Sequence, residues 1–143
     1  MSTFPAQVSQ AEVMRHVEAT NPWEDYDRNA LFHVPFSRYD WYGPVVLDVN
    51  DPRLGEIHPA SKRDVQRYRR MSTPFPAIVV SLEPGGRIAV HDGSHRLVAA
   101  RARQEPSLPG FIGLPKGADP AVLANGYTFL HRQTQDASDR VRA

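Results

Sequence analysis

The chain has 143 residues, of which 41% are hydrophobic and 23% charged, as in an ordinary single globular domain. Its formal net charge of +1 at pH 7 excludes a uniformly basic surface for nucleic acid, and the lack of cysteine excludes disulfides, thiolate metal sites and thiol catalysis. The N-terminus lacks the features of a secretory signal, and no apolar run approaches the ~18 residues of a membrane span. We therefore expect a cytoplasmic protein without membrane contact.

The N-terminal third predicts one helix followed by short extended segments. Ser9 and Glu12 form a capping signature, and the apolar residues after them recur at helical spacing until Pro22. The segments that follow are a loop at 23–30, a strand at 30–34, an aromatic-rich turn at 36–44 and a strand at 45–49.

A basic helix and a hairpin are expected in the middle of the chain. Ser61 and Asp64 form a second capping signature for a helix over 62–71, in which Val65 and Tyr68 mark the inner side and most other positions are basic. The hairpin consists of a strand at 77–82, a turn at 83–86 and a returning strand at 87–90.

The C-terminal third predicts a helix that leaves the motif at 91–96 and runs to about residue 104, with Arg101 and Arg103 facing solvent. Asp119 and Pro120 then form a cap and a first-turn proline. The other segments of this third are a loop at 106–110, a strand at 111–114, a continued helix at 127–132 and a polar tail at 133–143.

The most informative segment runs from His91 to Arg96, where an apolar strand meets a helix. Gly93 stands at the junction, a place where backbone can approach a ligand closely. His95 and Arg96 then fall in the first helical turn, where the helix dipole disfavours each cation by about 0.3–1 kcal/mol. A bound anion would reverse this local field, and helix N-termini commonly hold phosphate. The segment therefore predicts an anion site, with nucleotide phosphate as the expected ligand.

Three segments carry a resemblance to the ParB/sulfiredoxin superfamily between about Leu31 and Leu114. Residues 32–38 resemble the family's opening strand and its Pro-x-Ser/Asp-x segment, and 75–80 resemble its central Pro-Ile-Val-Val strand. Residues 92–100, which begin Asp-Gly-Ser-His-Arg, resemble its signature box. The resemblance implies an α+β fold, a small mixed sheet flanked by helices. It also implies a helical extension at 1–30, the family domain at 31–118 and a C-terminal helix with a tail at 119–143.

Proteins of this superfamily share phosphate handling and differ in chemistry, so the resemblance implies a nucleotide (ATP, ADP or CTP) with Mg²⁺ more firmly than any one reaction. Sulfiredoxin places a catalytic cysteine where this chain has Ser94. ParB carries a DNA-reading domain downstream, and fewer than thirty residues follow Leu114 here. The box is closest to that of the free-serine kinase, whose catalytic glutamate matches a place near His58, two or three residues from Glu56.

The box residues have expected roles, each with a structural alternative. Gly93 and Ser94 are expected to contact phosphate, or to form a plain turn and a helix cap. Arg96 offers a planar fork for phosphate oxygens, or a salt bridge to Asp92. Asp92 is a candidate Mg²⁺ ligand or catalytic base, and otherwise orients Arg96. His95 is a candidate catalytic group for proton transfer or charge stabilisation, or a structural histidine.

Several residues outside the box are weaker candidates. Arg38 is a possible additional phosphate ligand, and the neighbouring Trp41 and Tyr42 either stack on a base or belong to the core. The basic helix is either a solvated face or a surface for DNA contact. The residues for that contact are Lys62, Arg63, Arg67 and Arg70. A transition-metal site is not expected, because His91 and Asp92 of an extended strand point to opposite faces.

Three functions compete on these observations. The resemblance favours an enzyme, a nucleotide-dependent phosphotransferase or NTPase with a strand–loop–helix phosphate cradle. A ParB-like nuclease or DNA-associated protein would use the same box for a backbone phosphate. A non-catalytic module would use the fold to sense a nucleotide or to bind a protein partner.

Overall fold

The structure is a computed structural model that describes residues 6–20, 36–54, 57, 61–72, 74–124 and 128–129. The expected loop at 23–30, the strand at 30–34, Glu56 and the polar tail lie outside the described residues.

The described residues form a mixed sheet of six strands at the centre of the fold. The strands are β1 (Gln7–Val8), β2 (Tyr39–Asp48), β3 (Ile78–Leu82), β4 (Ile88–Asp92), β5 (Ser107–Pro115) and β6 (Thr128–Phe129). They are ordered β1-β2-β5-β3-β4, with β6 also paired to β2. The pair β3–β5 is parallel and the other pairs are antiparallel. The α+β class expected from the sequence is therefore confirmed.

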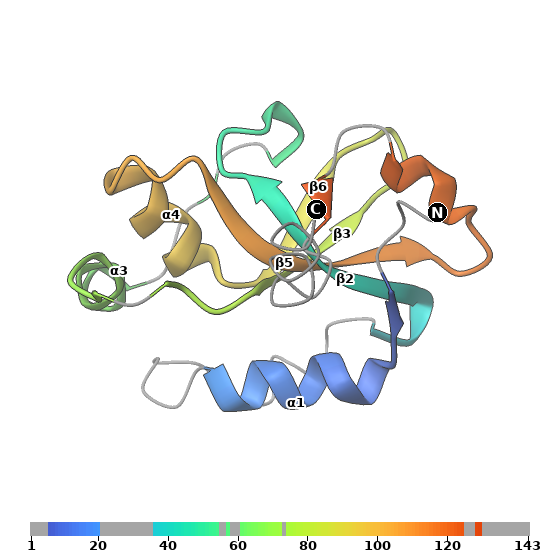
Figure 1. Ribbon diagram of the computed structural model, residues 1–143, viewed down its shortest axis with the longest axis horizontal. Helices are drawn as coiled ribbons and strands as arrows, with labels where there is room; N and C mark the ends of the chain where they lie inside the picture. Colours follow the sequence, from blue (N-terminus) through green and yellow to red (C-terminus); the bar gives the residue numbers. More distant parts are fainter. Residues whose placement is uncertain are drawn as a thin grey trace, which may run out of the picture.

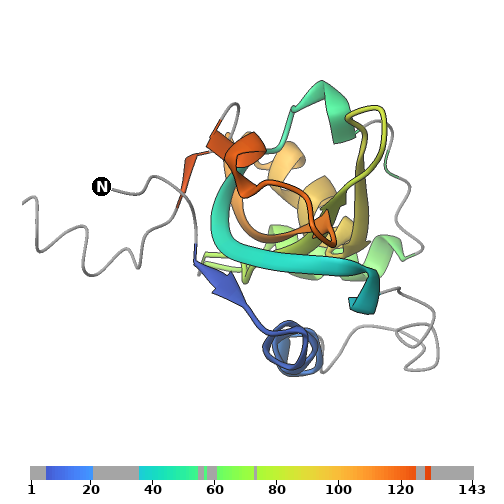
Figure 2. The same cartoon turned by 90° about the vertical axis from the view of Figure 1, so that its right-hand side faces the viewer.

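Helices cover both faces of this sheet. The helices are α1 (Gln10–Thr20), α3 (Lys62–Arg69) and α4 (Ser94–Ala102), with 3₁₀ turns η1 (Phe36–Arg38), η2 (Pro52–Leu54) and η3 (Pro120–Ala124). The apolar residues of α3 and α4 pack with Ile78 and Val80 in the larger core. Val13 and Val17 of α1 pack with Val79 on the other face. Figures 1 and 2 show α1 alone on its side of the sheet, while α3 and α4 lie next to each other.

The expected helix starts are confirmed by their capping bonds. The Ser9 hydroxyl accepts from the amide of Glu12 at 3.1 Å, and the Ser61 hydroxyl accepts from the amide of Asp64 at 3.2 Å. The Asp119 carboxylate accepts from the amide of Ala121 at 2.9 Å, although the element it opens is a 3₁₀ turn. The predicted hairpin is also present as β3 and β4.

Two segments expected to be turns or loops are strands. The turn expected at 36–44 is wrong beyond η1, because β2 continues through Gly43 and Pro44. The ladder shifts register between Tyr42 and Val45, so the proline lies in an irregularity that does not need its missing N–H. The loop expected at 106–110 is the start of β5. Its Pro109 lies before β3 pairs at Gly110, where β5 has only one neighbouring strand.

The end of the chain also differs from the expectation. A helix was predicted over 127–132, but Thr128–Phe129 forms β6, which pairs antiparallel with β2 at Val45 and Val46. The pairing partner lies some eighty residues earlier in the chain, so no local pattern could indicate it.

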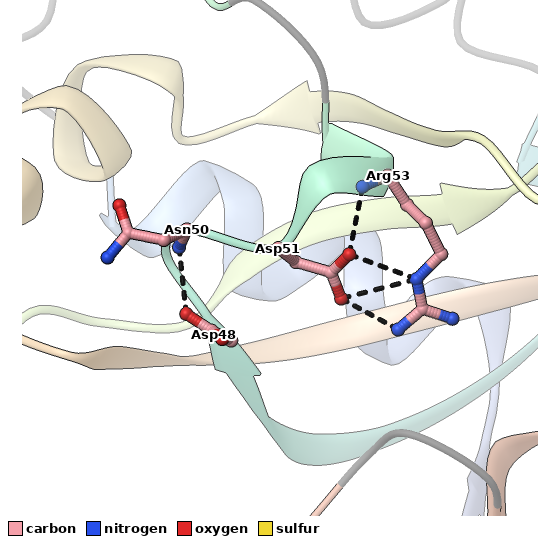
Figure 3. A network of polar contacts seen from close by, with 4 residues as sticks. All are labelled: Asp48, Asn50, Asp51 and Arg53. Atoms are coloured by element: carbon pink, nitrogen blue, oxygen red, sulfur yellow. Dashed lines mark hydrogen bonds and ion pairs between the residues drawn. The ribbon is translucent and has the colours of Figure 1, made fainter.

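A polar turn links β2 to η2 beside β4 (Figure 3). Asp48 accepts from the amide of Asn50 at 2.8 Å, and Asp51 accepts from the amide of Arg53 at 2.9 Å. The Arg53 guanidinium also binds both carboxylate oxygens of Asp51, at distances between 2.7 and 3.2 Å. Hydrogen bonding by the Arg53 side chain is the main reason that the pKa of Asp51 lies below its ordinary value.

Candidate functional site

The junction between β4 and α4 depends on Gly93. Its φ of 107° is in the left-handed region, and a Cβ there would collide with the side chain of Ile78. The backbone carbonyl of Gly93 accepts the amide of Leu97 at 2.9 Å, but no side chain caps this helix start. Close packing on β3 therefore explains the glycine by itself, and a ligand is not needed to account for it.

Arg96 is fully buried, and the protein itself surrounds its guanidinium. Its NH2 group donates to Oδ2 of Asp92 at 2.6 Å. Its NH1 group donates to the carbonyls of Pro76 and Ala77, at 3.1 and 2.9 Å. A cation in the first turn was expected to need the negative charge of a bound anion. Asp92 supplies that charge from within the protein, so Arg96 does not require an anion. Arg96 as a fork for phosphate does not fit this geometry.

His95 joins the start of α4 to the start of α3. The backbone amide of Ser61, the N-cap of α3, donates to Nε2 of His95 at 3.1 Å. A backbone N–H can only donate, so Nε2 must be unprotonated and the ring carries its proton on Nδ1. In this arrangement His95 is neutral. This geometry favours His95 as a hydrogen-bond acceptor that joins the two helices, rather than as an imidazolium that offsets phosphoryl charge.

Ser94 carries the hydroxyl group of the segment Asp92–Arg96. The residue is half-buried in the first turn of α4 and takes no part in capping it. Asp92 is partly exposed, with 13% of its side chain accessible. The surface that remains for an anion is therefore the α4 start around Ser94 and His95, next to the N-terminus of α3.

The residues that the structure describes do not form a site for a resident metal ion. Among the described residues there is no group of three or more histidine, aspartate or glutamate side chains that could hold one. Asp92 was the expected Mg²⁺ ligand, but its Oδ2 is already bonded to the guanidinium of Arg96. A divalent cation beside that buried charge would be repelled.

The other candidate residues lie outside the box, on η1, on β2 and along α3. Arg38 is exposed on η1, and its carbonyl accepts from the amide of Lys116 at 3.1 Å. Trp41 and Tyr42 are buried, so the core alternative holds for both. The basic residues expected to contact DNA are all exposed, on α3 or directly after it, namely Lys62, Arg63, Arg67 and Arg70.

Sequence reasoning missed two groups of residues. Ser61 was identified only as a cap, but its amide also binds His95 from 34 positions away. A cluster of polar side chains on the other face of the sheet was also missed, formed by Tyr39, Ser81, Glu83 and His91. Both groups connect separate elements, so no spacing in the sequence indicated them.

Comparisons with family models, curated proteins and solved structures find no significant match. The helices of the described residues are all too short or too polar to span a membrane. Fold and site define an α+β protein in which strand β4 enters helix α4 through a left-handed glycine, next to the N-terminus of a second, basic helix.

Proposed function

We propose that this protein is a nucleotide-binding domain of the ParB/sulfiredoxin type, which holds phosphate at the start of α4. The observation that carries the proposal is the meeting of two helix N-termini through the Ser61–His95 hydrogen bond, beside a helix start that no side chain caps. Each N-terminus carries a partial positive charge, so their fields add at the same place. Lys62 and Arg63 are exposed in the first turn of α3 and increase this field.

The box residues then take different roles from those that the sequence suggested. The first-turn amides and the Ser94 hydroxyl would donate to phosphate oxygens, and His95 would hold α3 and α4 in register. Arg96 and Asp92 would form a rigid support beneath the phosphate. Because Oδ2 of Asp92 is bonded to Arg96, any proton transfer by Asp92 would use Oδ1.

The proposed reaction class is phosphotransfer or nucleotide hydrolysis. Such reactions depend mainly on positioning and on stabilisation of phosphoryl charge, which a site built from amides and helix termini supplies. Mg²⁺ would arrive with the nucleotide and keep phosphate and water oxygens as its ligands, which it commonly does in such sites.

Calorimetric titration with ATP, ADP, CTP and GTP, with and without Mg²⁺, tests the proposal. At least one nucleotide should bind, and at a concentration of about 100 Kd it should stabilise the fold by roughly 2.7 kcal/mol. Hydrolysis or transfer is then measured by ³¹P NMR with the nucleotide that binds. If the protein binds none of the four, the proposal is wrong.

Ser94→Asp is the most specific variant for locating the site. A carboxylate at the first position of α4 complements the helix dipole by about 0.3–1 kcal/mol, so the variant should be at least as stable as the wild type. The same carboxylate would repel phosphate, so nucleotide affinity should fall at least about tenfold, or roughly 1.4 kcal/mol. Ser94→Asn is the neutral control of equal size and should retain most of the affinity. Equal affinity of both variants would place the ligand elsewhere.

The exposed basic residues of α3 favour DNA binding as a second candidate function. The helix exposes Lys62, Arg63, Arg67, Arg69 and Arg70, although the chain as a whole has a net charge of only +1. A duplex bound there should dissociate steeply with salt, with a slope of about −0.9 for each phosphate neutralised. Lys62→Glu with Arg63→Glu should remove about two units of that slope without changing stability. A weak, salt-insensitive interaction would leave nucleotide binding as the better proposal.

A further inference from the structure

A chain of hydrogen bonds connects polar side chains on the α1 side of the sheet. Tyr39 on β2 and Ser81 on β3 both donate to Oε2 of Glu83, at 2.9 and 2.8 Å. The Ser81 hydroxyl also lies 2.7 Å from Nε2 of His91 on β4. Ser81 is fully buried, and the other three side chains are half-buried. Such a network is costly to bury unless its members satisfy one another, so its geometry specifies how these strands fit together.

The direction of each bond follows from the groups involved. An ionised carboxylate can only accept, so both hydroxyl groups donate to Glu83. The Ser81 oxygen has then used its only proton and accepts from His91, which places the ring proton on Nε2. Burial lowers the pKa of His91 below its ordinary value of 6.5, against a smaller opposite effect of Glu83, and so favours this neutral form.

Gly113 leaves space on β5 beside this chain of hydrogen bonds. Gly113 pairs with Trp41 on one side and with Ser81 on the other, and it lies two positions before Pro115, which pairs with Tyr39. A Cβ at Gly113 would lie 2.9 Å both from Cβ of Tyr39 and from Cζ3 of Trp41, closer than packing normally allows. The absence of a side chain there leaves room over β5 for the Trp41 ring and for Tyr39, whose hydroxyl reaches Glu83.

His91 occupies the irregular position of the β3–β4 ladder. Val80 lies opposite Val90 but Val79 lies opposite Asp92, so His91 is an extra residue on β4. A one-residue bulge of this kind bends the strand and redirects the side chains beside it. The next residue is Asp92, which supplies the carboxylate of the buried Arg96.

We propose that His91 is a positioning residue, which pins this bulge through Ser81 and thereby directs Asp92 towards Arg96. Tyr39 and Glu83 anchor Ser81 and His91 to the rest of the sheet. A regular ladder would turn Asp92 to the opposite face, because side chains alternate along a strand. Arg96 would then be buried without its carboxylate. The consequence for phosphate binding rests on the proposed function, but the positioning itself does not.

Hydrogen exchange of the Arg96 guanidinium, measured by NMR, tests this inference directly. Arg96 is fully buried and both of its terminal nitrogens donate hydrogen bonds, so the N–H groups of these two nitrogens should exchange slowly in the wild type. In His91→Leu and Ser81→Ala, exchange should be faster by about tenfold, equivalent to roughly 1.4 kcal/mol. His91→Gln presents an amide N–H near the position of Nε2, and it should restore slow exchange.

Ser107→Ala is the matched control, because Ser107 lies at the far end of β5 from Gly113, opposite Asp48. In Ser107→Ala the Arg96 guanidinium should exchange at the same rate as in the wild type. If His91→Leu does not fold, Ser81→Ala decides, since it removes one oxygen atom. Unchanged exchange in a folded Ser81→Ala protein would overturn the proposal, as would a His91→Gln protein that exchanges as fast as Ser81→Ala.

Nucleotide titration of the wild type, set beside the Arg96 exchange of the variants, separates this inference from the proposed function. If the wild type binds no nucleotide but Arg96 exchange responds as expected, the proposed function fails and the positioning role stands. If the wild type binds nucleotide and Arg96 exchange does not respond, the positioning role fails alone.

Discussion

The neighbouring helices α3 and α4 both carry basic residues, but they use them in opposite ways. On α3 the basic side chains from Lys62 to Arg70 are exposed. On α4, Arg96 is fully buried against Asp92, and Nε of Arg101 donates to the carbonyl of Val49 at 2.7 Å.

Arg103, directly after α4, is bonded in the same manner. It donates to the carbonyl of Tyr68, pairs with Glu105 at 2.7 Å and lies 4.7 Å from the centre of the Phe75 ring. The expectation that Arg101 and Arg103 face solvent is therefore wrong. The comparison teaches that α4 uses arginine to join parts of the fold, while α3 presents its cations to solvent, where a partner could reach them.

Breaking the buried ion pair should give the largest effect. Asp92→Ala leaves the guanidinium of Arg96 buried without a counter-charge and should lower the free energy of unfolding by about 3–5 kcal/mol. Replacing both partners, as in Asp92→Leu with Arg96→Met, should cost much less, because no buried charge remains. Urea denaturation measures both. A cost below about 1 kcal/mol for Asp92→Ala would mean that water reaches Arg96, and that α4 resembles α3 after all.

The two helix starts should also respond differently. Gly93→Ala combines an unfavourable left-handed backbone with a collision against Ile78 and should cost about 2–4 kcal/mol. Ser61→Ala removes the α3 cap and should cost about 1 kcal/mol. If both variants lost the same stability, packing against β3 would not make the start of α4 more sensitive than the start of α3.

The same substitution on each helix sharpens the comparison. Arg101→Ala removes a hydrogen bond to Val49 together with the packing of the side chain, and should cost about 1 kcal/mol. Arg63→Ala on the exposed side of α3 should stay within about 0.5 kcal/mol of the wild type. Thermal unfolding of the two variants at the same pH and salt gives both values. If Arg63→Ala lost more stability than Arg101→Ala, then α3 and not α4 would be the helix whose arginines join parts of the fold.

Acidification just below pH 6.5 should have the smallest effect, and the part of it that comes from His91 should act beside α4. Arginine does not titrate in this range, but His91 precedes Asp92, and burial lowers its pKa below 6.5. Its contribution to stability is therefore fully present above pH 6.5 and is lost as the pH falls through the lower pKa of the folded state. His91→Gln should unfold with a weaker pH dependence over that window. An identical pH dependence in both proteins would contradict this origin.

Local patterns predicted the elements whose signals lie within a few residues. The caps at Ser9, Ser61 and Asp119 were readable because donor and acceptor are two or three positions apart. The turn at 83–86 and the apolar runs beside it predicted the β3–β4 hairpin for the same reason. The Pro-rich segments misled, because proline is tolerated at an irregular or one-sided position of a strand, and only the neighbouring strands show where such a position lies.

The sequence by itself determined the α+β class, the helix starts and the strand–glycine–helix segment of the candidate site. It left open whether Arg96 would bind phosphate or Asp92, and the fold decided for Asp92 by burying the guanidinium among carbonyls 19 and 20 residues away. The fold also brought Ser61 to His95 and connected Tyr39 to His91 through Glu83 and Ser81. The free energy of a charged or polar side chain depends on the groups that replace its water, and those groups come from elements distant in the sequence.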